Sequence, residues 1–334
     1  MDFSFLDDAI KKRECITYTD TEPKINDNVF HIAYGIDANF VRPMGVAMTS
    51  IVENNQESEF VFHVLTDGLD DEGKASLREF AKQYKQHIFL YYINSIVFDR
   101  LPSTAHFTKA TYNRFLLPKA LAEIAKRVIY LDADILCLAN FTDLLNLDFK
   151  DKVVSVVHDI DAVAKRQIRS LGLKENQYFN AGFLYIDIEA WNREHISEKA
   201  LEVSFARLGQ LDWLDQDALN IVLEGKVQYI DQKYDYIFDL GGNKSIENLP
   251  QNTVFVHYAG RFKPWHEWCM HPLKDDFIHY AVLSPWADVP LVHPQSYKDM
   301  KKMAKSYFYY NKIIDGLLWY AKYSLYKIKA KIGM

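Results

Sequence analysis

The chain has 334 residues, of which 49% are hydrophobic, enough to build one large α/β domain with an appendage or two separate domains. A formal net charge of −6 gives no sign of the dominant basic surface that nucleic-acid-binding proteins usually show, so we expect no nucleic-acid partner. The three cysteines are an odd number without C-x-x-C spacing, which argues against a disulfide framework and a structural zinc site.

The first part of the chain, residues 1–28, contains no recognisable motif, and we treat it as an N-terminal extension. It lacks a basic segment followed by an apolar one, which is the pattern of a secretory signal. No uninterrupted apolar run of about 18 residues, the length that spans a bilayer, occurs anywhere in the chain. We therefore expect the protein to stay in the cytoplasm.

Strands and helices are expected to alternate over the next part of the chain. Short apolar runs rich in β-branched and aromatic residues predict strands, and runs with helical spacing predict helices between them. The strands are expected over residues 29–37, 60–67 and 88–94, and the helices over residues 42–55 and 69–84. This alternation predicts an α/β fold with a mostly parallel sheet flanked by helices on both faces.

Two polar residues, Asp37 and Asn39, follow the first predicted strand. Open α/β sheets bind ligands at the carboxyl ends of their strands, but Asp and Asn are also favoured helix caps, so both roles remain open. Neither G-x-G-x-x-G nor G-x-x-x-x-G-K-[ST] occurs at this place, so no glycine-rich loop is available to hold phosphates. A nucleotide bound here would need a metal ion to hold its phosphates.

The central stretch, residues 127–138, is the apolar run RVIYLDADILCL, interrupted only by Asp132 and Asp134. It predicts a buried strand, and side chains two apart on an extended chain share one face. Two carboxylates held so close repel each other unless a cation lies between them, and their hard oxygen atoms suit Mg²⁺ or Mn²⁺. The alternative is that a strand simply ends here and its carboxylates face water.

Other polar or small residues also stand at the ends of predicted elements. Each has a structural alternative: a salt bridge for an arginine, a plain turn for small residues, and the helix dipole for acidic residues in a first turn. The positions are Thr111 and Arg114 before a helix, Asp159 near the end of a strand over residues 153–161, Asn180, Ala181 and Gly182 before an apolar run, and Asp215, Gln216 and Asp217 at the start of a helix over residues 213–225.

A second informative stretch, residues 253–268, is TVFVHYAGRFKPWHEW. A short strand delivers His257, and Gly260 permits a tight turn before Lys263. A neutral imidazole is a normal Mn²⁺ ligand, and a lysine neutralises a phosphate as a point charge. The alternative is a structural histidine with a solvated lysine. The nearby H-E-W-C-M-H differs in spacing from the H-E-x-x-H of zinc proteases, which excludes that class.

The C-terminal segment, residues 297–334, differs in composition from the rest of the chain. It carries nine lysines against two aspartates, and aromatic residues alternate with the lysines. A helix with basic side chains on one face and Trp, Tyr, Leu and Ile on the other suits the surface of an anionic membrane. The alternative is a C-terminal helix docked on the domain with its lysines in solvent.

Five motifs in this order resemble those of the family-8 retaining glycosyltransferases, which have a GT-A (Rossmann-like) fold: AYGIDANF, RVIYLDADIL, YFNAGFLYID, LDQDALN and FVHYAGRFKPW. The resemblance covers residues 29–290, which we predict to be the glycosyltransferase domain. Residues 291–334 would then be a basic and aromatic helical tail that associates with a membrane. Within the family, the closest likeness is to the enterobacterial lipopolysaccharide outer-core glucosyl- and galactosyltransferases, which share AYGID, a Ser-Pro-Trp segment (residues 284–286) and a basic tail.

The resemblance implies a role for each matched residue. Asp132, Asp134 and His257 would bind Mn²⁺ or Mg²⁺, and Asp215 and Gln216 would lie at the reacting sugar. The residues that the resemblance assigns to the UDP-sugar donor are Asp37, Asn39, Thr111, Arg114, Asp132, Ala133, Asp134, Asp159, Asn180, Ala181, Gly260 and Lys263. Arg114 would also brace the metal carboxylates. Many relatives have serine where this chain has Ala181, which matters little if the contact is made by the backbone.

The resemblance also implies a reaction. A glucose or galactose residue would pass from UDP to the growing lipopolysaccharide outer core with retention of configuration, at the inner face of the cytoplasmic membrane. Retention requires either a protein nucleophile or attack from the face that UDP leaves, and we favour same-face attack because the amide of Gln216 is a weak nucleophile. The sequence does not distinguish the two sugars, since they differ in the orientation of one hydroxyl.

Three other functions compete with this one. A nucleotidyltransferase would share the sheet and the metal carboxylates but usually carries a glycine-rich N-terminal signature, which is missing after Ile36. A non-catalytic sugar-nucleotide-binding protein would have no need for three metal-ligand residues and Lys263 together. A glycosyltransferase acting on another cell-surface glycan would differ in its acceptor alone.

Overall fold

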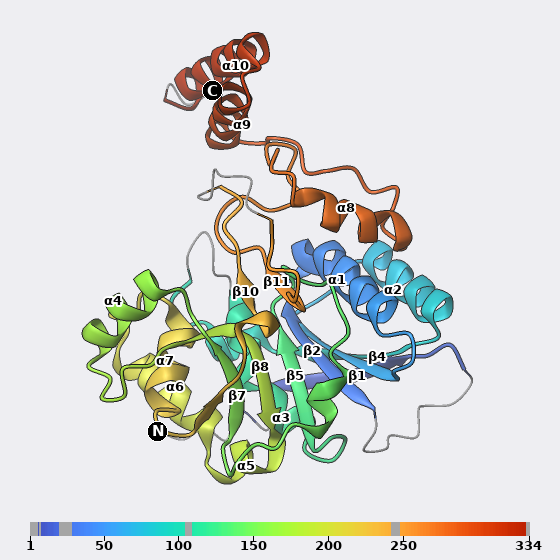
Figure 1. Ribbon diagram of the computed structural model, residues 1–334, viewed down its shortest axis with the longest axis vertical. Coiled ribbons are helices and arrows are strands. Elements are labelled where there is room, and N and C mark those ends of the chain that lie inside the picture. The colour runs from blue at the N-terminus through green and yellow to red at the C-terminus, as the bar shows by residue number, and fades with distance from the viewer. Residues whose placement is uncertain (1–5, 7, 20–28, 104–108, 242–247, 332–334) are drawn as a thin grey trace. The chain divides into compact units, whose positions relative to one another are not determined.

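The computed structural model describes residues 6, 8–19, 29–103, 109–241 and 248–331 (Figure 1). The chain divides into two compact units. The first comprises Met1–Ile237 and Leu249–His257, and the second comprises Phe238–Asn248 and Tyr258–Met334. The boundaries of these units differ from the domain limits expected from the sequence, residues 1–28, 29–290 and 291–334. Those domain limits remain a prediction.

The first unit is built on a sheet of eight strands in the order β1-β4-β3-β2-β5-β8-β7-β9 (Figure 1). The neighbouring strands β4, β3, β2 and β5 run parallel, as the alternation of strands and helices predicts. The bounds are β1 (Ile10–Ile16), β2 (Phe30–Ile36), β3 (Phe60–Thr66), β4 (His87–Ile93), β5 (Arg127–Leu131), β7 (Val154–His158), β8 (Phe179–Asp187) and β9 (Val227–Tyr229). The predicted α/β fold with a mostly parallel sheet is therefore confirmed.

Strand β8 makes the sheet mixed, because it runs antiparallel to both of its neighbours, β5 and β7. The end of β7 at His158 lies beside the start of β8 at Phe179. Helix α4 (Asp161–Leu171) therefore begins and ends at the same edge of the sheet, as expected for a connection between antiparallel strands. As a result, the start of β8 lies at the same edge as the end of β5.

Strand β1 lies within the segment that the sequence analysis treats as an extension without motifs. It pairs antiparallel with β4 at the edge of the sheet. Its sequence, IKKRECI, is mostly charged and half exposed, so it shows no apolar run. Charged side chains are common on edge strands because they discourage pairing with other chains.

Helices cover the sheet, and every residue of β3 is buried, as expected for a strand covered on both faces. Helix α1 contacts α2, and α7 packs against β8 and α6. The remaining α-helices of this unit are α1 (Val41–Asn54), α2 (Asp71–Tyr84), α3 (Leu117–Ala120), α5 (Ile188–Arg193), α6 (Ile196–Ala206) and α7 (Leu214–Val222). The 3₁₀ helices are η2 (Ala38–Phe40), η3 (Ser95–Phe98), η4 (Lys109–Phe115), η5 (Thr142–Asn146) and η6 (Gln232–Tyr234).

A second sheet of three short strands, in the order β10-β11-β6, accompanies the large one. Its strands are β6 (Ile135–Cys137), β10 (Tyr236–Ile237) and β11 (Phe255–His257). The predicted single strand over residues 127–138 is therefore wrong in detail: β5 ends at Leu131, a turn follows, and β6 joins the other sheet. The backbone N–H of Ile135 donates to the carbonyl of Asp132 across this turn at 3.1 Å.

The second unit contains α8 (Lys274–Leu283), α9 (Tyr297–Tyr309) and α10 (Ile313–Lys331). The predicted helical tail is present as two helices, α9 and α10, that pack against each other. Gly316 permits this packing, because a Cβ there would lie 2.5 Å from the ring of Phe308. Within the described ranges, no helix combines the length and the apolar character needed to cross a bilayer.

A buried histidine pair lies inside the large sheet. His31 on β2 and His63 on β3 are joined by a hydrogen bond of 2.9 Å between Nδ1 and Nε2, and the other nitrogen of His63 lies 3.1 Å from the hydroxyl of Tyr91. Burial lowers the pKa of His31 to about 4. Burial, followed by the neighbouring charges of His31 and Arg13, lowers the pKa of His63 well below its usual value.

We predict that this pair destabilises the protein in mild acid. As pH falls below about 6.5, His31 binds a proton in the unfolded chain, whereas in the folded chain it stays neutral until pH is near 4. The free energy of unfolding is therefore unaffected by His31 above pH 6.5 and decreases as pH falls from 6.5 towards 4. Between about pH 7.5 and pH 5, His31 should cost about 2 kcal/mol of unfolding free energy. Urea unfolding of the wild type and His31→Gln measures the difference; an equal pH response in both would contradict the prediction.

Candidate active site

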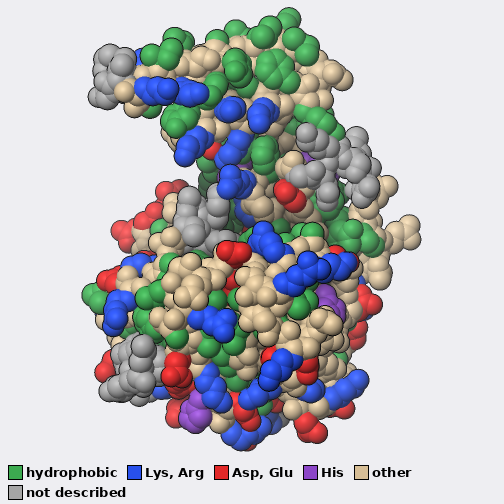
Figure 2. Space-filling model, turned by 90° about the vertical axis from the view of Figure 1, so that its left-hand side faces the viewer, with side chains coloured by type: hydrophobic (Ala, Val, Ile, Leu, Met, Phe, Trp, Pro, Cys, Tyr) green, Lys and Arg blue, Asp and Glu red, His purple; other side chains and the backbone are tan. Residues whose placement is uncertain are grey.

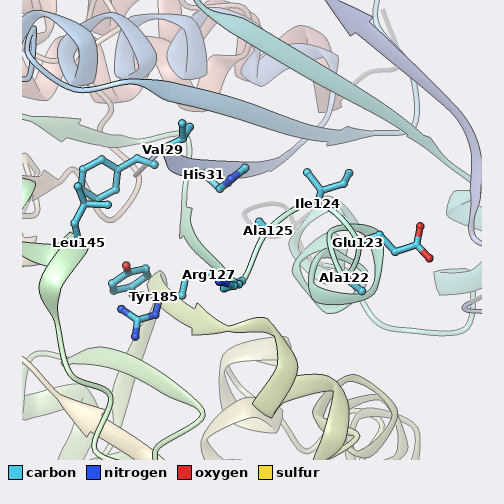
Figure 3. Close-up of a pocket in the computed structure, with 11 residues that line it drawn as sticks. Val29, His31, Ala122, Glu123, Ile124, Ala125, Arg127, Leu145 and Tyr185 are labelled. Atoms are coloured by element: carbon cyan, nitrogen blue, oxygen red, sulfur yellow. The ribbon is translucent and has the colours of Figure 1, made fainter. Parts of the chain in front are cut away.

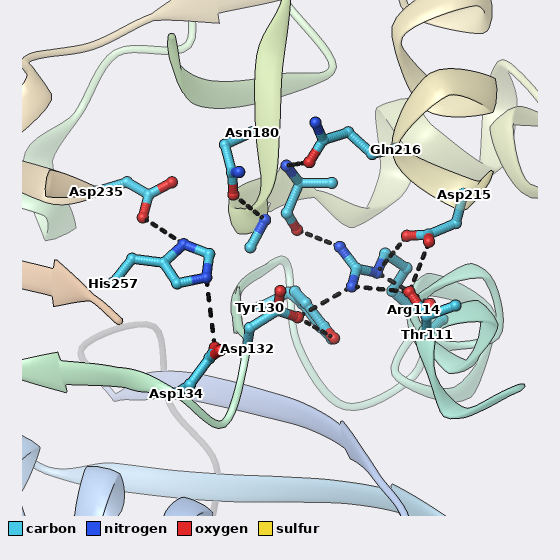
Figure 4. A network of polar contacts seen from close by, with 12 residues as sticks. Thr111, Arg114, Tyr130, Asp132, Asp134, Asn180, Asp215, Gln216, Asp235 and His257 are labelled. Carbon is cyan, nitrogen blue, oxygen red and sulfur yellow. Dashed lines mark hydrogen bonds and ion pairs between the residues drawn. The ribbon is translucent and has the colours of Figure 1, made fainter. Parts of the chain in front are cut away.

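Three metal-ligand side chains meet in the first unit. One ligand atom from each of Asp132, Asp134 and His257 lies within 4.8 Å of the others (Figure 4). The two aspartates come from the turn between β5 and β6, and His257 is the last residue of β11. His257 pairs with Ile135 in the small sheet, which brings its imidazole beside Asp134. The Nε2 atom of His257 lies 3.4 Å from Oδ1 of Asp134.

The opposite side of the imidazole faces a third carboxylate. Oδ1 of Asp235 lies 3.1 Å from Nδ1 of His257, and Asp235 is completely buried. Burial alone would lower the pKa of His257, but Asp134 and Asp235 raise it well above its usual value. Burial also raises the pKa of Asp235, and the charge of His257 opposes this shift. The imidazole is thus held between two carboxylates.

Arg114 connects the first metal-ligand carboxylate to a second acidic residue (Figure 4). The guanidinium is buried and lies 2.9 Å from Oδ1 of Asp132 and 3.0 Å from Oδ2 of Asp215. It also donates to the carbonyl of Ala181 and lies over the ring of Tyr130, 4.5 Å from its centroid. Burial alone would lower the pKa of Arg114, but Asp215, followed by Tyr130 and Asp132, raises it. Arg114 therefore stays charged between the two carboxylates.

Asp215 shares this network from the first turn of α7. Its Oδ1 accepts a hydrogen bond from the hydroxyl of Thr111, and the residue is 3% exposed. Burial raises the pKa of Asp215 to about 6, although Arg114 and Thr111 act in the opposite direction. Both partners of Asp215 come from η4, which places this helix against the start of α7.

The amide of Gln216 is fixed by three hydrogen bonds. Its Oε1 accepts from the backbone N–H of Ala181 at 3.0 Å. Its Nε2 donates to Oδ2 of Asp159 at 2.8 Å and to the hydroxyl of Tyr178 at 3.0 Å. The hydroxyl of Tyr178 in turn donates to Oδ1 of Asp217 at 2.6 Å. The amide therefore has one orientation, with its oxygen towards the start of β8.

A family model described as "Glycosyl transferase family 8" matches residues 31–269 of the chain, and a model described as "Glycosyl transferase family 8 C-terminal" matches residues 271–327. The first match alone covers more than half of the chain. The chain belongs to glycosyltransferase family 8.

Curated relatives extend over almost the whole chain. The family-8 chain is 36% identical over 304 residues to a lipopolysaccharide 1,3-galactosyltransferase of Salmonella typhimurium, which covers 88% of this chain and 90% of the relative. It is 33% identical over 308 residues to the lipopolysaccharide glucosyltransferase WaaO of Escherichia coli. That alignment covers 89% of this chain and 91% of WaaO.

A solved structure confirms the fold. The galactosyltransferase LgtC, crystallised in complex with donor and acceptor sugar analogues, matches with a TM-score of 0.67 at 24% identity, over 76% of this chain and 96% of LgtC. At this identity the match concerns the fold alone. It confirms the GT-A fold that the family resemblance implies.

Most of the residues that the sequence analysis assigns to the site lie together in the first unit of this family-8 chain. They are linked by hydrogen bonds or ion pairs, or lie in the turn that carries the aspartates. These residues are Thr111, Arg114, Asp132, Ala133, Asp134, Asp159, Asn180, Ala181, Asp215, Gln216 and His257. Their functional roles remain predictions.

The other four residues lie elsewhere. Asp37 follows β2, the parallel neighbour of β5, so it lies at the same edge of the sheet as Asp132. Its side chain accepts from the N–H of Asn39 at 2.9 Å, which is the cap that the sequence analysis left as an alternative. Gly260 and Lys263 belong to the second unit, where Lys263 donates to the carbonyl of Tyr258 at 2.7 Å. Their predicted contact with the donor remains a prediction.

The sequence analysis missed several residues of this site. Asp235 belongs to none of the five motifs, and only the pairing of distant strands places it beside His257. Tyr130 lies within RVIYLDADIL but was given no role, although its hydroxyl donates to Oδ1 of Asp132 at 2.8 Å. Gly182 appeared only as part of a turn, but a Cβ there would lie 2.6 Å from Cε1 of His257. Asp217 accepts from the N–H of Trp213 at 2.9 Å, as an acidic residue at a helix start often does.

Two cavities of the described part of the chain lie away from this site. One, of about 480 Å³, is lined by residues that include His31, Arg127 and Tyr185 (Figure 3). The other, of about 550 Å³, shares Lys126 and Arg127 with it. Arg127 begins β5, whereas the metal-ligand turn follows the end of β5, so these cavities lie at the opposite edge of the sheet.

We predict that Arg114→Ala destabilises the protein by about 3–5 kcal/mol, because it leaves the buried carboxylate of Asp215 without its counter-charge. Arg114 and Asp215 side chains are 5% and 4% exposed. In a double-mutant cycle with Asp215→Ala, the coupling should exceed about 1 kcal/mol. The exposed pair Lys165 and Asp161 is the matched control and should show a much smaller coupling, because solvent screens both charges. Chemical unfolding measures both, and equal coupling in the two cycles would contradict the prediction.

Proposed function

We propose that this family-8 enzyme transfers glucose or galactose from a UDP-sugar to the growing lipopolysaccharide outer core, with retention of configuration and with a divalent metal ion. The observation that carries the proposal is the meeting of Asp132, Asp134 and His257, in a network that reaches the fixed amide of Gln216 through Arg114 and Ala181. The curated relatives support the acceptor, since those reported above are a lipopolysaccharide galactosyltransferase and a lipopolysaccharide glucosyltransferase.

The donor set fits Mn²⁺ or Mg²⁺. Two carboxylates and one imidazole supply hard oxygen and borderline nitrogen ligands, and these three leave positions open for other ligands. Oδ1 of Asp132 already accepts hydrogen bonds from Arg114 and Tyr130, which orient the carboxylate. When bound, the ion would offset the negative charge that develops on the diphosphate as UDP leaves.

The side chains near the reacting sugar favour same-face attack. Neither candidate nucleophile is free: Oε1 of Gln216 accepts from Ala181, and Asp215 is engaged by Thr111 and Arg114. In same-face attack, the acceptor oxygen bonds to the anomeric carbon while the bond from that carbon to the diphosphate breaks. The proton of the acceptor hydroxyl passes to the departing phosphate oxygen. A trapped covalent glycosyl-enzyme would contradict this mechanism.

The transferase reaction is tested by UDP release. UDP-glucose and UDP-galactose are offered separately, with Mn²⁺ and truncated lipopolysaccharide, to the wild type, Asp134→Ala and the control Asp148→Ala. We expect turnover of one donor and a loss of about 100-fold or more in Asp134→Ala alone, because a metal ligand is removed at the charge-developing centre. Metal-dependent UDP binding without turnover of either donor would instead favour a binding protein or another acceptor glycan.

The second unit supports a membrane location for this reaction. Helix α10 buries only Gly316 and Tyr323; Trp319 is half-buried, and its other large apolar side chains are exposed. Six of these are more than half exposed and recur at helical spacing along the helix: Ile313, Ile314, Leu317, Leu318, Leu325 and Ile328. In the space-filling view, apolar side chains and lysines gather on these C-terminal helices (Figure 2).

An anionic lipid surface matches both properties of α10. Its apolar side chains would enter the boundary between headgroups and acyl chains, and its lysines would contact the anionic headgroups. Lys322, Lys327, Lys329 and Lys331 all lie on this helix, against the single acidic residue Asp315. We infer that the tail holds the enzyme on the inner face of the cytoplasmic membrane, where a lipid-linked acceptor would be found.

We predict that the full-length protein binds vesicles that contain one third anionic lipid, and that Ile314→Asp with Leu318→Asp weakens this binding at least about tenfold. The control carries Ile96→Asp and Val282→Asp, which are similarly exposed at 67% and 65% but lie outside α10. Vesicle co-sedimentation measures binding, and UDP release by donor hydrolysis should stay unchanged. Equal binding by both double variants would argue against this role of α10.

A further inference from the structure

Asp235 is an unusual carboxylate in this fold. It is completely buried, and its Oδ2 has no hydrogen-bond partner among the described residues. A buried carboxylate oxygen without a partner is costly, so a residue of this kind calls for an explanation other than packing. Its other oxygen, Oδ1, lies 3.1 Å from Nδ1 of His257.

The small sheet fixes the backbone on both sides of this contact. Asp235 directly precedes β10, and its backbone N–H donates to the carbonyl of Gln232 at 3.1 Å. In the parallel pair of β10 and β11, Ile237 lies opposite His257. On the other side of β11, His257 lies opposite Ile135, the residue after Asp134. Asp235, the imidazole and Asp134 therefore form a row across one three-stranded sheet (Figure 4).

The row decides which ring nitrogen can bind a metal ion. A neutral imidazole carries one proton, and a carboxylate beside Nδ1 favours the form with that proton on Nδ1. Nε2, which lies 3.4 Å from Asp134, then presents its lone pair to the two metal-ligand carboxylates. The other form would place a lone pair against the carboxylate of Asp235, and it would turn an N–H towards a bound metal ion, so it could not act as a ligand.

Gly182 leaves the space that this ring orientation needs. A Cβ at this position would lie 2.6 Å from Cε1 and 3.0 Å from Nδ1 of His257. The carbonyl of Gly182 also accepts from the N–H of Asp132 at 2.8 Å, so its backbone stands at a fixed place beside the turn. A side chain at position 182 would therefore displace the His257 ring from Asp235 or Asp134.

We propose that Asp235 is a positioning residue that fixes the proton and the orientation of the His257 ring for metal binding, in a space that Gly182 keeps open. This rests on the proposed metal-dependent function but adds two residues that do not themselves touch the ion. Because Asp235 acts through His257, its loss should weaken metal binding without removing a ligand.

The test measures the affinity of the full-length protein for Mn²⁺ with saturating UDP, by electron paramagnetic resonance of the free ion. Asp235→Ala should weaken Mn²⁺ binding about 10–100-fold, the usual effect of losing a partner of a metal-binding histidine. Asp235→Asn should lose less, since its amide oxygen still accepts from Nδ1. The control Asp231→Asn, on the same segment, removes the charge of a side chain whose Oδ1 accepts from the N–H of Lys233 at 2.8 Å, and it should match the wild type.

A second readout separates positioning from general damage. In Asp235→Ala, the Mn²⁺ concentration for half-maximal turnover should rise by about the same factor as the dissociation constant for Mn²⁺. The kcat at saturating Mn²⁺ should stay within a few-fold of the wild type. Gly182→Ala crowds the same ring without removing a charge, and its Cβ would also lie 2.8 Å from Oδ1 of Asn180. It should weaken Mn²⁺ binding about tenfold or more. Its control is Gly68→Ala, where an added Cβ meets nothing within 4 Å.

The outcomes are distinguishable. If the wild type binds Mn²⁺ and the folded Asp235 and Gly182 variants bind it equally well, the positioning role is wrong and the proposed function stands. If the wild type itself binds no Mn²⁺ in the presence of UDP, the metal dependence of the proposed function is wrong, and the positioning role falls with it.

Discussion

The repulsion between Asp132 and Asp134 is the constraint on which the site depends. Both carboxylates lie in one short turn, and neither is fully exposed, so water alone does not screen them. The fold supplies positive charge from two sides, with Arg114 beside Asp132 and His257 beside Asp134. A divalent ion would add to this compensation. The turn is therefore stable only within the network that surrounds it.

The same turn joins the two sheets of the first unit. Strand β5 belongs to the large sheet and β6 to the small one, so the aspartates lie where the chain passes between them. Gln216, on α7, is held to the large sheet by its hydrogen bond to Ala181 of β8. His257 ends β11 of the small sheet, and Asp235 directly precedes β10. Gln216 and His257 are therefore each anchored to a different hydrogen-bonded sheet, which limits the movement of both side chains.

The two compact units carry different kinds of chemistry. In the first, buried charges are paired and amide and hydroxyl groups have fixed partners, which suits selective recognition of a polar substrate. In the second, α10 exposes most of its apolar side chains among lysines, which suits a surface without a defined shape such as a bilayer. Ordered polar contacts and an exposed apolar face would suit the two tasks that we propose for these units.

The sequence by itself determined the alternation of strands and helices, the residue types of the metal cluster and the family, because these depend on short motifs and local periodicity. The extended strand that it implied for Asp132 and Asp134 was wrong, since a turn and a change of sheet bring them together. It showed neither the charged edge strand β1 nor the positions of Asp235 and Gly182 beside the His257 ring. Only tertiary structure decided these, because strand register and the space beside a ring depend on residues far apart in the chain.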